Sequence, residues 1–190
     1  NLSGVNISEA IIIETNFWKA DLSGQDFTVI SKASIDVTVF IEANLSNSNF
    51  EGVDLSPKNI FFKTFKNKAY LMHGKTQTSA TELIIKENLF GKHDYVIIIS
   101  AEVRGNDLAV NYIFYNNFAR ANLENANFKN ASLGYVNFYS ANLTNANFSG
   151  ADLRNAFLSG ADLSNANLSG AILTGAVFTD AKTSGCTGCP

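Results

Sequence analysis

The stretch that decides the fold runs from Ala121 to Asp180 and reads ANLENANFKNASLGYVNFYSANLTNANFSGADLRNAFLSGADLSNANLSGAILTGAVFTD, twelve variants of one five-residue unit. Each unit begins with Ala, except for Val136, and usually continues with Asn or Asp. The third, central residue is always Leu or Phe, and a mostly small or polar pair completes the unit. A pattern this regular predicts a repetitive architecture rather than an irregular globular core.

A five-residue period fits neither a straight strand nor a helix. In a strand, side chains alternate between the two faces, so apolar residues five apart would point to opposite sides. In a helix of about 100° per residue, each step of five rotates the apolar residue by about 140°, and no apolar stripe forms. The chain must therefore bend once per unit. Ala and the central Leu or Phe lie two residues apart and both point inward from a short extended segment.

The fifth position supplies the bend. Gly and Asn tolerate positive φ, which a type II turn requires at its third residue. A chain that turns at every unit winds into stacked coils whose backbones can pair, as in a β-solenoid. The positions that favour this turn are Asn125, Asn130, Asn145, Gly150, Asn155, Gly160, Asn165, Gly170 and Gly175.

Two units, Ala151–Asn155 (ADLRN) and Ala161–Asn165 (ADLSN), closely resemble the A(D/N)LXX motif of the pentapeptide-repeat family. This resemblance implies an all-β fold, a right-handed quadrilateral β-helix with four units per coil. It also suggests a bacterial, in particular a cyanobacterial, origin. The register set by hand has central residues from Leu2 to Tyr70 and from Ile98 to Phe178, which corresponds to about seven to eight coils.

With four units per coil, Phe is predicted to stack on Phe along two opposite sides of the coil and Leu on Leu along the other two. Three extra residues, Ile30–Lys32, are expected to bulge at one corner. Corner residues of the first block, such as Lys19 and Glu42, tolerate positive φ poorly, so either the turn type or the register differs there. The predicted interior ladder consists of Leu123, Phe128, Leu133, Phe138, Leu143, Phe148 and Leu153.

The chain is predicted to form one domain over residues 1–190, with an insertion at 73–95 and a C-terminal cap at 182–190. Within the insertion, Ser79 and Glu82 have the spacing of a capping box and predict a short helix. The insertion is either a tolerated loop or the element that carries a partner contact.

Cys186 and Cys189 are the only cysteines, and a CxxC pair can be a redox motif, half of a zinc site or a disulfide. There is no second ligand pair at zinc spacing and no βαβ pattern around them. We therefore predict a disulfide that closes the C-terminal end, with two free thiols as the main alternative. A disulfide would favour an oxidising compartment.

Other chemistry is weakly represented. His73 and His93 flank the insertion and are interpreted as loop histidines, the alternative being a metal or acid–base site. The sequence contains no nucleophile–base arrangement, phosphate-binding glycine loop or paired-carboxylate signature. We expect no catalytic residue, no cofactor, no metal and no small-molecule substrate, and hence no enzyme.

The first functional hypothesis is a non-catalytic structural or protein–protein interaction module with an unknown protein partner. Four aromatic residues project outward in the predicted register, and a patch of Tyr135 and Tyr139 is a candidate contact surface. The family resemblance suggests export to the thylakoid lumen or periplasm, which the Cys pair favours, with the cytoplasm as the alternative. The four outward aromatic residues are Trp18, Tyr115, Tyr135 and Tyr139.

The second hypothesis is a DNA mimic, because some members of the family bind DNA gyrase in place of DNA. Residues 1–54 carry eight acids and two bases, which fits in part. However, the net charge is only −3, residues 55–105 carry eight bases, and the C-terminal dimerisation segment of gyrase-binding members is not apparent. Direct nucleic-acid binding is not expected, the oligomeric state is open, and no apolar run is long enough for a membrane span.

Overall fold

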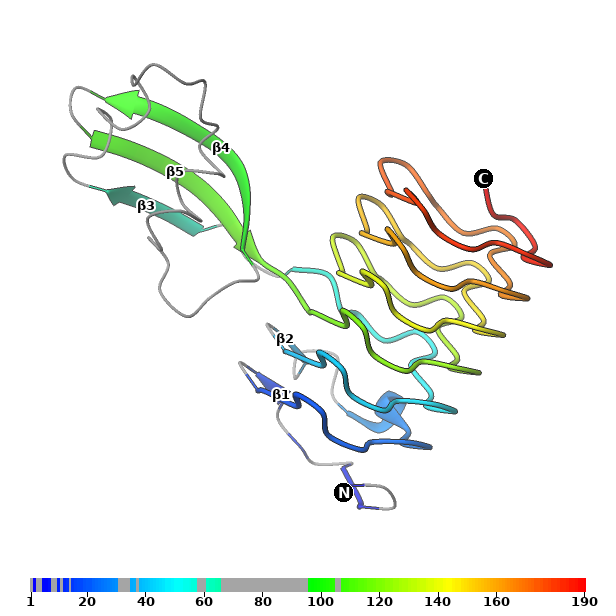
Figure 1. Ribbon diagram of the computed structural model, residues 1–190. Helices are drawn as coiled ribbons and strands as arrows, with labels where there is room; N and C mark the ends of the chain where they lie inside the picture. Colours follow the sequence, from blue (N-terminus) through cyan, green and yellow to red (C-terminus); the bar gives the residue numbers. More distant parts are fainter. Residues whose placement is uncertain are drawn as a thin grey trace. The chain divides into compact units, whose positions relative to one another are not determined.

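The structure, a computed structural model, forms two compact units: unit 1 comprises residues 1–56 and 115–190, and unit 2 comprises residues 57–114. Figure 1 shows the stacked coils of unit 1 and the three-stranded sheet of unit 2. The residues described by the structure are 2, 5–7, 10, 12–13, 15–30, 35–36, 38–57, 61–65, 96–104 and 107–190.

Unit 1 winds with a period of twenty residues. Parallel bridges join Asn122 to Asn142 and Asn142 to Asp162, so each coil contains four five-residue units. The four sides of the coil are numbered here by the residue that precedes the central Leu or Phe. In one coil, side 1 carries Asn137, side 2 Asn142, side 3 Asn147 and side 4 Asp152. Near the N-terminus, strands β1 (Ile12–Ile13) and β2 (Ile35–Asp36) pair in parallel.

The corners are four-residue turns with positive φ at their third residue. The Ala126 N–H donates to the Leu123 carbonyl (3.1 Å), and Asn125 between them has φ 58°, as in a type II turn. Lys19 and Glu42 also adopt this conformation, each with φ 57°, so the register continues through them. A different turn occurs at Val29, where the 3-10 helix η1 (Phe27–Val29) is capped by the Asp26 carboxylate.

The interior is a continuous apolar core. All seven residues predicted for the ladder are buried. Phe rings stack along side 1 at centroid separations of 5.3, 4.5 and 5.4 Å, in the order Phe17, Phe40, Phe118 and Phe138. They stack along side 3 at 4.2, 4.9 and 4.9 Å, in the order Phe27, Phe50, Phe128 and Phe148. The two files meet edge to face, as Phe128 and Phe138 do at 5.7 Å.

Four interior positions that usually hold Ala carry polar residues instead, and each donates a side-chain hydrogen bond to a backbone carbonyl. They are Gln25, Thr38, Ser48 and Asn116. Asn116 lies just after unit 2, and its Nδ2 donates to the carbonyl of Leu55, just before unit 2 (2.8 Å). Its Oδ1 accepts from the Thr38 N–H (2.8 Å). A buried amide therefore joins the two chain segments at which unit 2 is inserted.

The insertion of unit 2 preserves the register of the coil. Asn44 pairs with Asn122, which is exactly one coil further along once the whole of unit 2 is left out of the count. Asp21 pairs with Asn44 at a spacing three longer than one coil, which agrees with the three extra residues expected in the first block. Without unit 2, Tyr115 would follow Ser56 directly and occupy the corner position of an ordinary unit.

Unit 2 contains β3 (Phe61–Phe65), β4 (Val96–Arg104) and β5 (Asp107–Phe114), which form an antiparallel sheet in the order β3-β5-β4. The predicted coil centres at Ile98, Val103, Leu108 and Ile113 are therefore wrong. The apolar residues recur every five positions here, but Asn or Gly does not recur at the corners. Runs rich in β-branched residues favour long strands instead.

The segment outside the repeat, residues 57–114, is longer than the predicted insertion at 73–95. The expected insertion at 73–95, with its helix and with His73 and His93, lies outside the described residues. Seven predicted unit centres fall within 57–114, so the predicted number of coils is too high. Residues 182–190, predicted as a cap, instead continue the coil, because Lys182 pairs with Asp162 and Thr187 pairs with Asn167.

In the described part of the chain, no helix has both the length and the apolar character needed to cross a membrane.

Deleting residues 57–114, so that Ser56 joins Tyr115, should leave unit 1 folded, because the coil continues with its twenty-residue period when unit 2 is left out of the count. Urea unfolding, followed by circular dichroism and by the fluorescence of Trp18, the only Trp, should remain cooperative. Its midpoint should be no lower than that of the full chain. Deleting residues 57–116 is the matched control. It also removes Asn116 and puts Phe118 out of register, so it should unfold at lower urea. Equal urea midpoints for the two deletions would contradict the position at which unit 2 is inserted between Ser56 and Tyr115.

Phe138→Ala should lower the free energy of unfolding by about 3–5 kcal/mol, because it removes a fully buried ring from the side 1 file. Tyr139→Ala is the adjacent control. Its side chain is exposed, so the loss should be about 1 kcal/mol or less. Urea titration of both variants measures the difference, and similar losses would contradict the inward position of Phe138.

Candidate functional site

Side 2 of unit 1 is covered by a ladder of amides that bond to one another. Asn142 Nδ2 donates to Asn122 Oδ1 (2.9 Å), and Asn122 Nδ2 donates to Asn44 Oδ1 (3.1 Å). Asn142 Oδ1 also accepts from the Thr144 N–H (3.1 Å), which closes an Asx turn. Asn suits this position because it accepts within its own turn and donates to the adjacent coil, whereas an ionised Asp only accepts. The polar groups of this ladder already have partners within unit 1.

Side 1 differs from side 2 because apolar residues occupy its outward positions. The row before the central residue contains Val39, Phe157 and Val177 among Asn residues, which their bridges place in one file. The row after the central residue contains Trp18, Ile41, Ala119 and Tyr139. We call this surface the aromatic side, and define it by Trp18, Ile41, Tyr139, Phe157 and Val177.

Exposure distinguishes the aromatic side. Among the residues whose side-chain burial is described, seven large hydrophobic side chains are exposed, and three of them lie on this side: Trp18 (57% exposed), Tyr139 (54%) and Val177 (38%). Scattered exposed apolar residues are ordinary, but aromatic residues gathered on one surface are typical of protein interfaces. The aromatic side is therefore the leading candidate for a contact surface.

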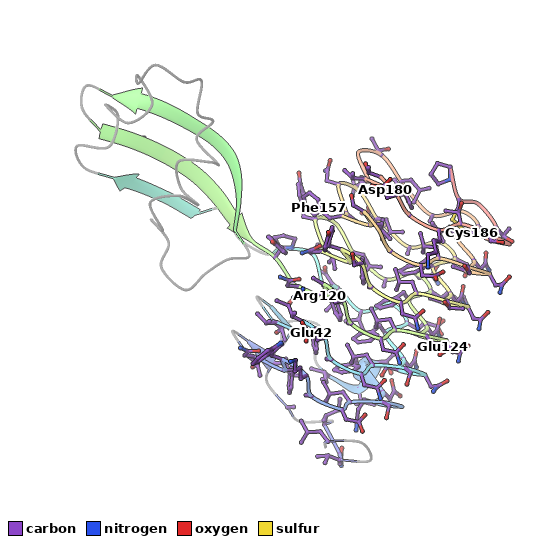
Figure 2. The ribbon with its side chains drawn as sticks, viewed as in Figure 1. Glu42, Arg120, Glu124, Phe157, Asp180 and Cys186 are labelled. Atoms are coloured by element: carbon purple, nitrogen blue, oxygen red, sulfur yellow. A yellow bond between two sulfur atoms is a disulfide. The ribbon has the colours of Figure 1, made fainter. Side chains whose placement is uncertain are left out.

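A column of charged residues forms the corner between sides 1 and 2, and we call it the charged corner. Lys19 Nζ lies 3.4 Å from Glu42 Oε2, and Arg120 NH2 lies 3.1 Å from Glu42 Oε1. Figure 2 shows Glu42 and Arg120 close together on this part of the coil. The two cationic side chains are more exposed (59% each) than Glu42 (31%), so the column presents positive charge to the solvent.

The charged corner is not explained by stability. Lys19, Glu42 and Arg120 have φ of 57°, 57° and 58°, and the left-handed region costs roughly 1–2 kcal/mol for such residues. Exposed ion pairs contribute about 0–1 kcal/mol each, so two pairs do not offset three strained residues. The corner requires this conformation but not residues that are poorly suited to it, and their presence favours a functional hypothesis. The corner between sides 2 and 3 has residues suited to this conformation, namely Gly24, Asn47, Asn125, Asn145, Asn165 and Gly185.

The charged corner borders the aromatic side directly. Lys19 Nζ lies 4.6 Å from the centroid of the Trp18 ring, a cation–π contact. The Arg120 N–H donates to the carbonyl of Tyr139 (2.8 Å). Trp, Tyr and Arg are the residues most enriched in interface hot spots, where a few side chains supply most of the binding energy. Trp18, Lys19, Arg120 and Tyr139 have this composition and lie along one side of four successive coils.

The outward aromatic residues predicted from the sequence are only partly brought together. Trp18 and Tyr139 are exposed on side 1, whereas Tyr115 and Tyr135 are half-buried near the corner between sides 4 and 1. Tyr115 lies 6.4 Å from Phe157 (ring centroids), and Figure 2 marks Phe157 on the coil. Sequence reasoning missed Phe157, whose signal is an aromatic residue at a position that usually holds Asn or Asp.

The acidic residues of the first block do not form a file of free carboxylates. Glu42 pairs with Lys19 and Arg120. Glu51 lies 3.3 Å from Lys129 Nζ, a contact that lowers the pKa of Glu51. Asp21 accepts from Ser23, which lowers its pKa. The next three residues in the file of Asp21 are amides rather than acids, namely Asn44, Asn122 and Asn142. Asp26 and Asp54 likewise accept from a Thr and a Ser two residues later.

Two further carboxylates are held ionised by neighbouring donors. The Arg154 guanidinium lowers the pKa of Asp152, with which it forms a close ion pair (2.5 Å). Hydrogen bonds from Ser164, and then the Lys182 ammonium at 3.3 Å, lower the pKa of Asp162. Each of these two carboxylates therefore already has partners within unit 1.

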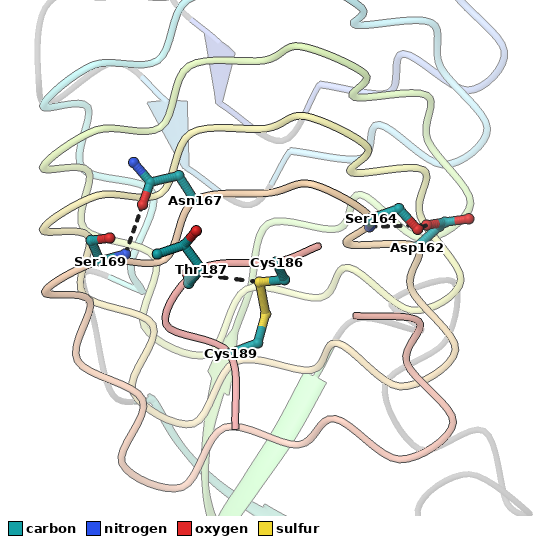
Figure 3. Close-up of a disulfide and its surroundings, with 7 residues drawn as sticks. All are labelled: Asp162, Ser164, Asn167, Ser169, Cys186, Thr187 and Cys189. Carbon is teal, nitrogen blue, oxygen red and sulfur yellow. Dashed lines mark hydrogen bonds between the residues drawn. A yellow bond between two sulfur atoms is a disulfide. The ribbon is translucent and has the colours of Figure 1, made fainter. Parts of the chain in front are cut away.

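The structure contains the predicted disulfide between Cys186 and Cys189, seen in Figure 3. Because the two residues are only three apart, closing their loop contributes about 2 kcal/mol in the chain-entropy model. No group of three or more His, Cys, Asp or Glu side chains suitable for a metal ion occurs among the described residues.

A family model described as Pentapeptide repeats matches the chain in eight copies, at residues 1–28, 31–56, 117–145 and 141–180. These matches omit unit 2 entirely. No curated protein matches the chain.

Several solved structures are similar to this chain. A pentapeptide repeat protein from the Arabidopsis thaliana thylakoid lumen is 30% identical over 35% of this chain and 46% of its own length, with a TM-score of 0.33. The chain thus spans slightly less than half of that plant protein. Rfr23 from the cyanobacterium Cyanothece 51142 is 21% identical over 92% of this chain and 84% of its own, with a TM-score of 0.38. QnrB1, a plasmid-mediated fluoroquinolone resistance protein, is 16% identical over 92% and 70%, with a TM-score of 0.31.

The lowered carboxylate pKa values predict loss of stability in acid. A group whose pKa is lower in the folded state stabilises the fold above its unfolded pKa, about 4, and loses that contribution as the pH falls. The urea midpoint should therefore be nearly constant from about pH 8 to pH 5 and fall below about pH 4. Asp162→Asn should reduce this acid dependence, because it removes one of the shifted groups. An unchanged pH profile in Asp162→Asn would contradict the contribution of Asp162.

Proposed function

Because the chain belongs to the pentapeptide-repeat family, we propose that unit 1 is a non-catalytic protein–protein interaction module built as a right-handed quadrilateral β-helix. Its contact surface is the aromatic side together with the charged corner. The observation that carries this proposal is the exposure of Trp18 and Tyr139 beside the cations Lys19 and Arg120 on one side of the coil.

The chemistry of this surface specifies the kind of partner. The exposed rings of Trp18 and Tyr139 fit apolar pockets in another protein, where burial of aromatic area supplies affinity. The cations of the charged corner are more exposed than Glu42 and favour carboxylates on the partner near those pockets. The partner is therefore a folded protein whose contact patch combines apolar pockets with acidic residues.

The alternative, a DNA mimic that binds DNA gyrase, has weaker support. Mimicry requires carboxylates at regular intervals that imitate phosphates. In the described coils, the file that starts at Asp21 continues with three Asn residues and reaches another acid only at Asp162. Glu42 and Glu51 are paired with cations. These observations favour contact through the aromatic side.

We also propose an oxidising compartment, the thylakoid lumen or periplasm, with the cytoplasm as the alternative. The support is the Cys186–Cys189 disulfide, because disulfides persist mainly outside reducing compartments.

The binding surface is tested by substitution of its two exposed rings. Proteins captured by the wild-type chain from an extract of its own organism are identified, and each Kd is measured with purified partner. Trp18→Ala combined with Tyr139→Ala should weaken the Kd at least about 10-fold, as expected for hot-spot residues. Ser149→Ala combined with Ser169→Ala, on side 3, is the control and should leave the Kd unchanged.

Unchanged affinity in the aromatic double variant would overturn the proposed surface. The chain lacking residues 57–114 separates a contribution of unit 2 from that of unit 1. Inhibition of gyrase supercoiling by wild type and double variant alike would favour the DNA mimic instead.

A further inference from the structure

Residues 186–189 depart from the ordinary five-residue unit at the last coil. Cys186 occupies the inward position that Ala holds elsewhere, and Gly188 occupies the position of the central Leu or Phe. Gly188 has φ 78°, and a Cβ added there would lie only 2.8 Å from the backbone of Leu168 in the coil beneath. The backbone of Gly188 therefore lies against Leu168, where a side chain would normally fill the interior.

The disulfide is the main link that holds this arrangement. Thr187 is anchored by two backbone bonds, from its N–H to the Ala166 carbonyl (2.9 Å) and from the Leu168 N–H to its own carbonyl (2.7 Å). Among the described residues, positions 188–190 make no comparable backbone bond to the coil beneath. Opening the disulfide therefore breaks no backbone pairing between coils.

The disulfide is also reachable. Cys186 and Cys189 pack against the edge of the hydrophobic core, but both side chains are only partly buried. Cys186 Sγ lies 3.8 Å from the Thr187 carbonyl, in an exposed contact (Figure 3). Disulfides that solvent can reach are more labile than deeply buried structural ones.

We propose that Cys186–Cys189 is a reversible thiol–disulfide exchange site whose co-reactant is a dithiol. One thiolate of the dithiol attacks a sulfur of the pair, which breaks the Cys186–Cys189 bond and forms a mixed disulfide. The second thiolate of the reagent then displaces the remaining cysteine thiolate, which takes up a proton. The dithiol ends as a disulfide, and its two electrons reside on the two protein thiols.

Reduction changes the surface of the last coil. Without the disulfide, Gly188 is no longer held against Leu168, whose side chain is almost completely buried in the oxidised form (1% exposed). The neighbouring interior residues Leu173 and Phe178 are already only partly buried. The exchange site therefore controls how much apolar surface is exposed at this part of unit 1, separately from the aromatic side.

The test treats the full chain with dithiothreitol under native conditions and follows free thiols by maleimide labelling and mass spectrometry. Two thiols should appear without change in the far-ultraviolet circular dichroism, and removal of the reagent with mild oxidant should restore the disulfide. Hydrogen exchange should accelerate at least about 10-fold at the amides of Cys186 and Thr187, which bond to the carbonyls of Thr183 and Ala166, and stay unchanged at residues 121–160.

The variant Cys186→Ser with Cys189→Ser should reproduce the exchange pattern of the reduced chain without any reagent. Thiols that appear only at urea concentrations that unfold unit 1 would overturn the proposal. Acceleration of exchange throughout residues 121–160 would overturn it as well, because the disulfide would then be a structural link rather than a local exchange site. Neither readout depends on the aromatic side, so the proposed partner contact stands or falls separately.

Discussion

The structure of unit 1 depends on a turn with positive φ at almost every corner of the coil. This turn allows the chain to bend while the backbone of each coil pairs with the next, and it keeps Ala and the central Leu or Phe inside. The interior can then be almost uniform, as the stacked files of Phe and Leu are. The features that distinguish this chain from other chains built on the same repeat therefore lie in its outward residues and its corner residues. The backbone constrains the corner residues only through φ.

The outward residues divide into two kinds. The amides on side 2 form hydrogen bonds with one another and stabilise adjacent coils, so little of their bonding capacity remains for a partner. The aromatic side and the charged corner have the opposite character, since Trp18 and Tyr139 are exposed and Lys19, Glu42 and Arg120 adopt an unfavourable conformation. The proposed contact surface is therefore the one whose residues are not explained by the requirements of the repeat.

Sequence reasoning predicted most of what local pattern controls. The buried ladder from Leu123 to Leu153, the turns at Asn and Gly, and the disulfide all follow from neighbouring residues. It failed at Ile98–Ile113, where five-residue spacing of apolar residues arises by coincidence in long antiparallel strands. It also missed the charged corner, because its members lie far apart in the sequence and become neighbours only once the extra residues and unit 2 are placed.

The amide of Asn116 has a thermodynamic consequence for unit 2. By bonding the carbonyl of Leu55, it holds together the two points between which unit 2 leaves and returns. A free segment of that length would lose about 3–4 kcal/mol of chain entropy on bringing its ends together. Once unit 1 is folded, that restriction is in place, and β3, β4 and β5 then assemble from a segment whose ends are already held together. A folded unit 1 thus lowers the entropic cost of folding unit 2.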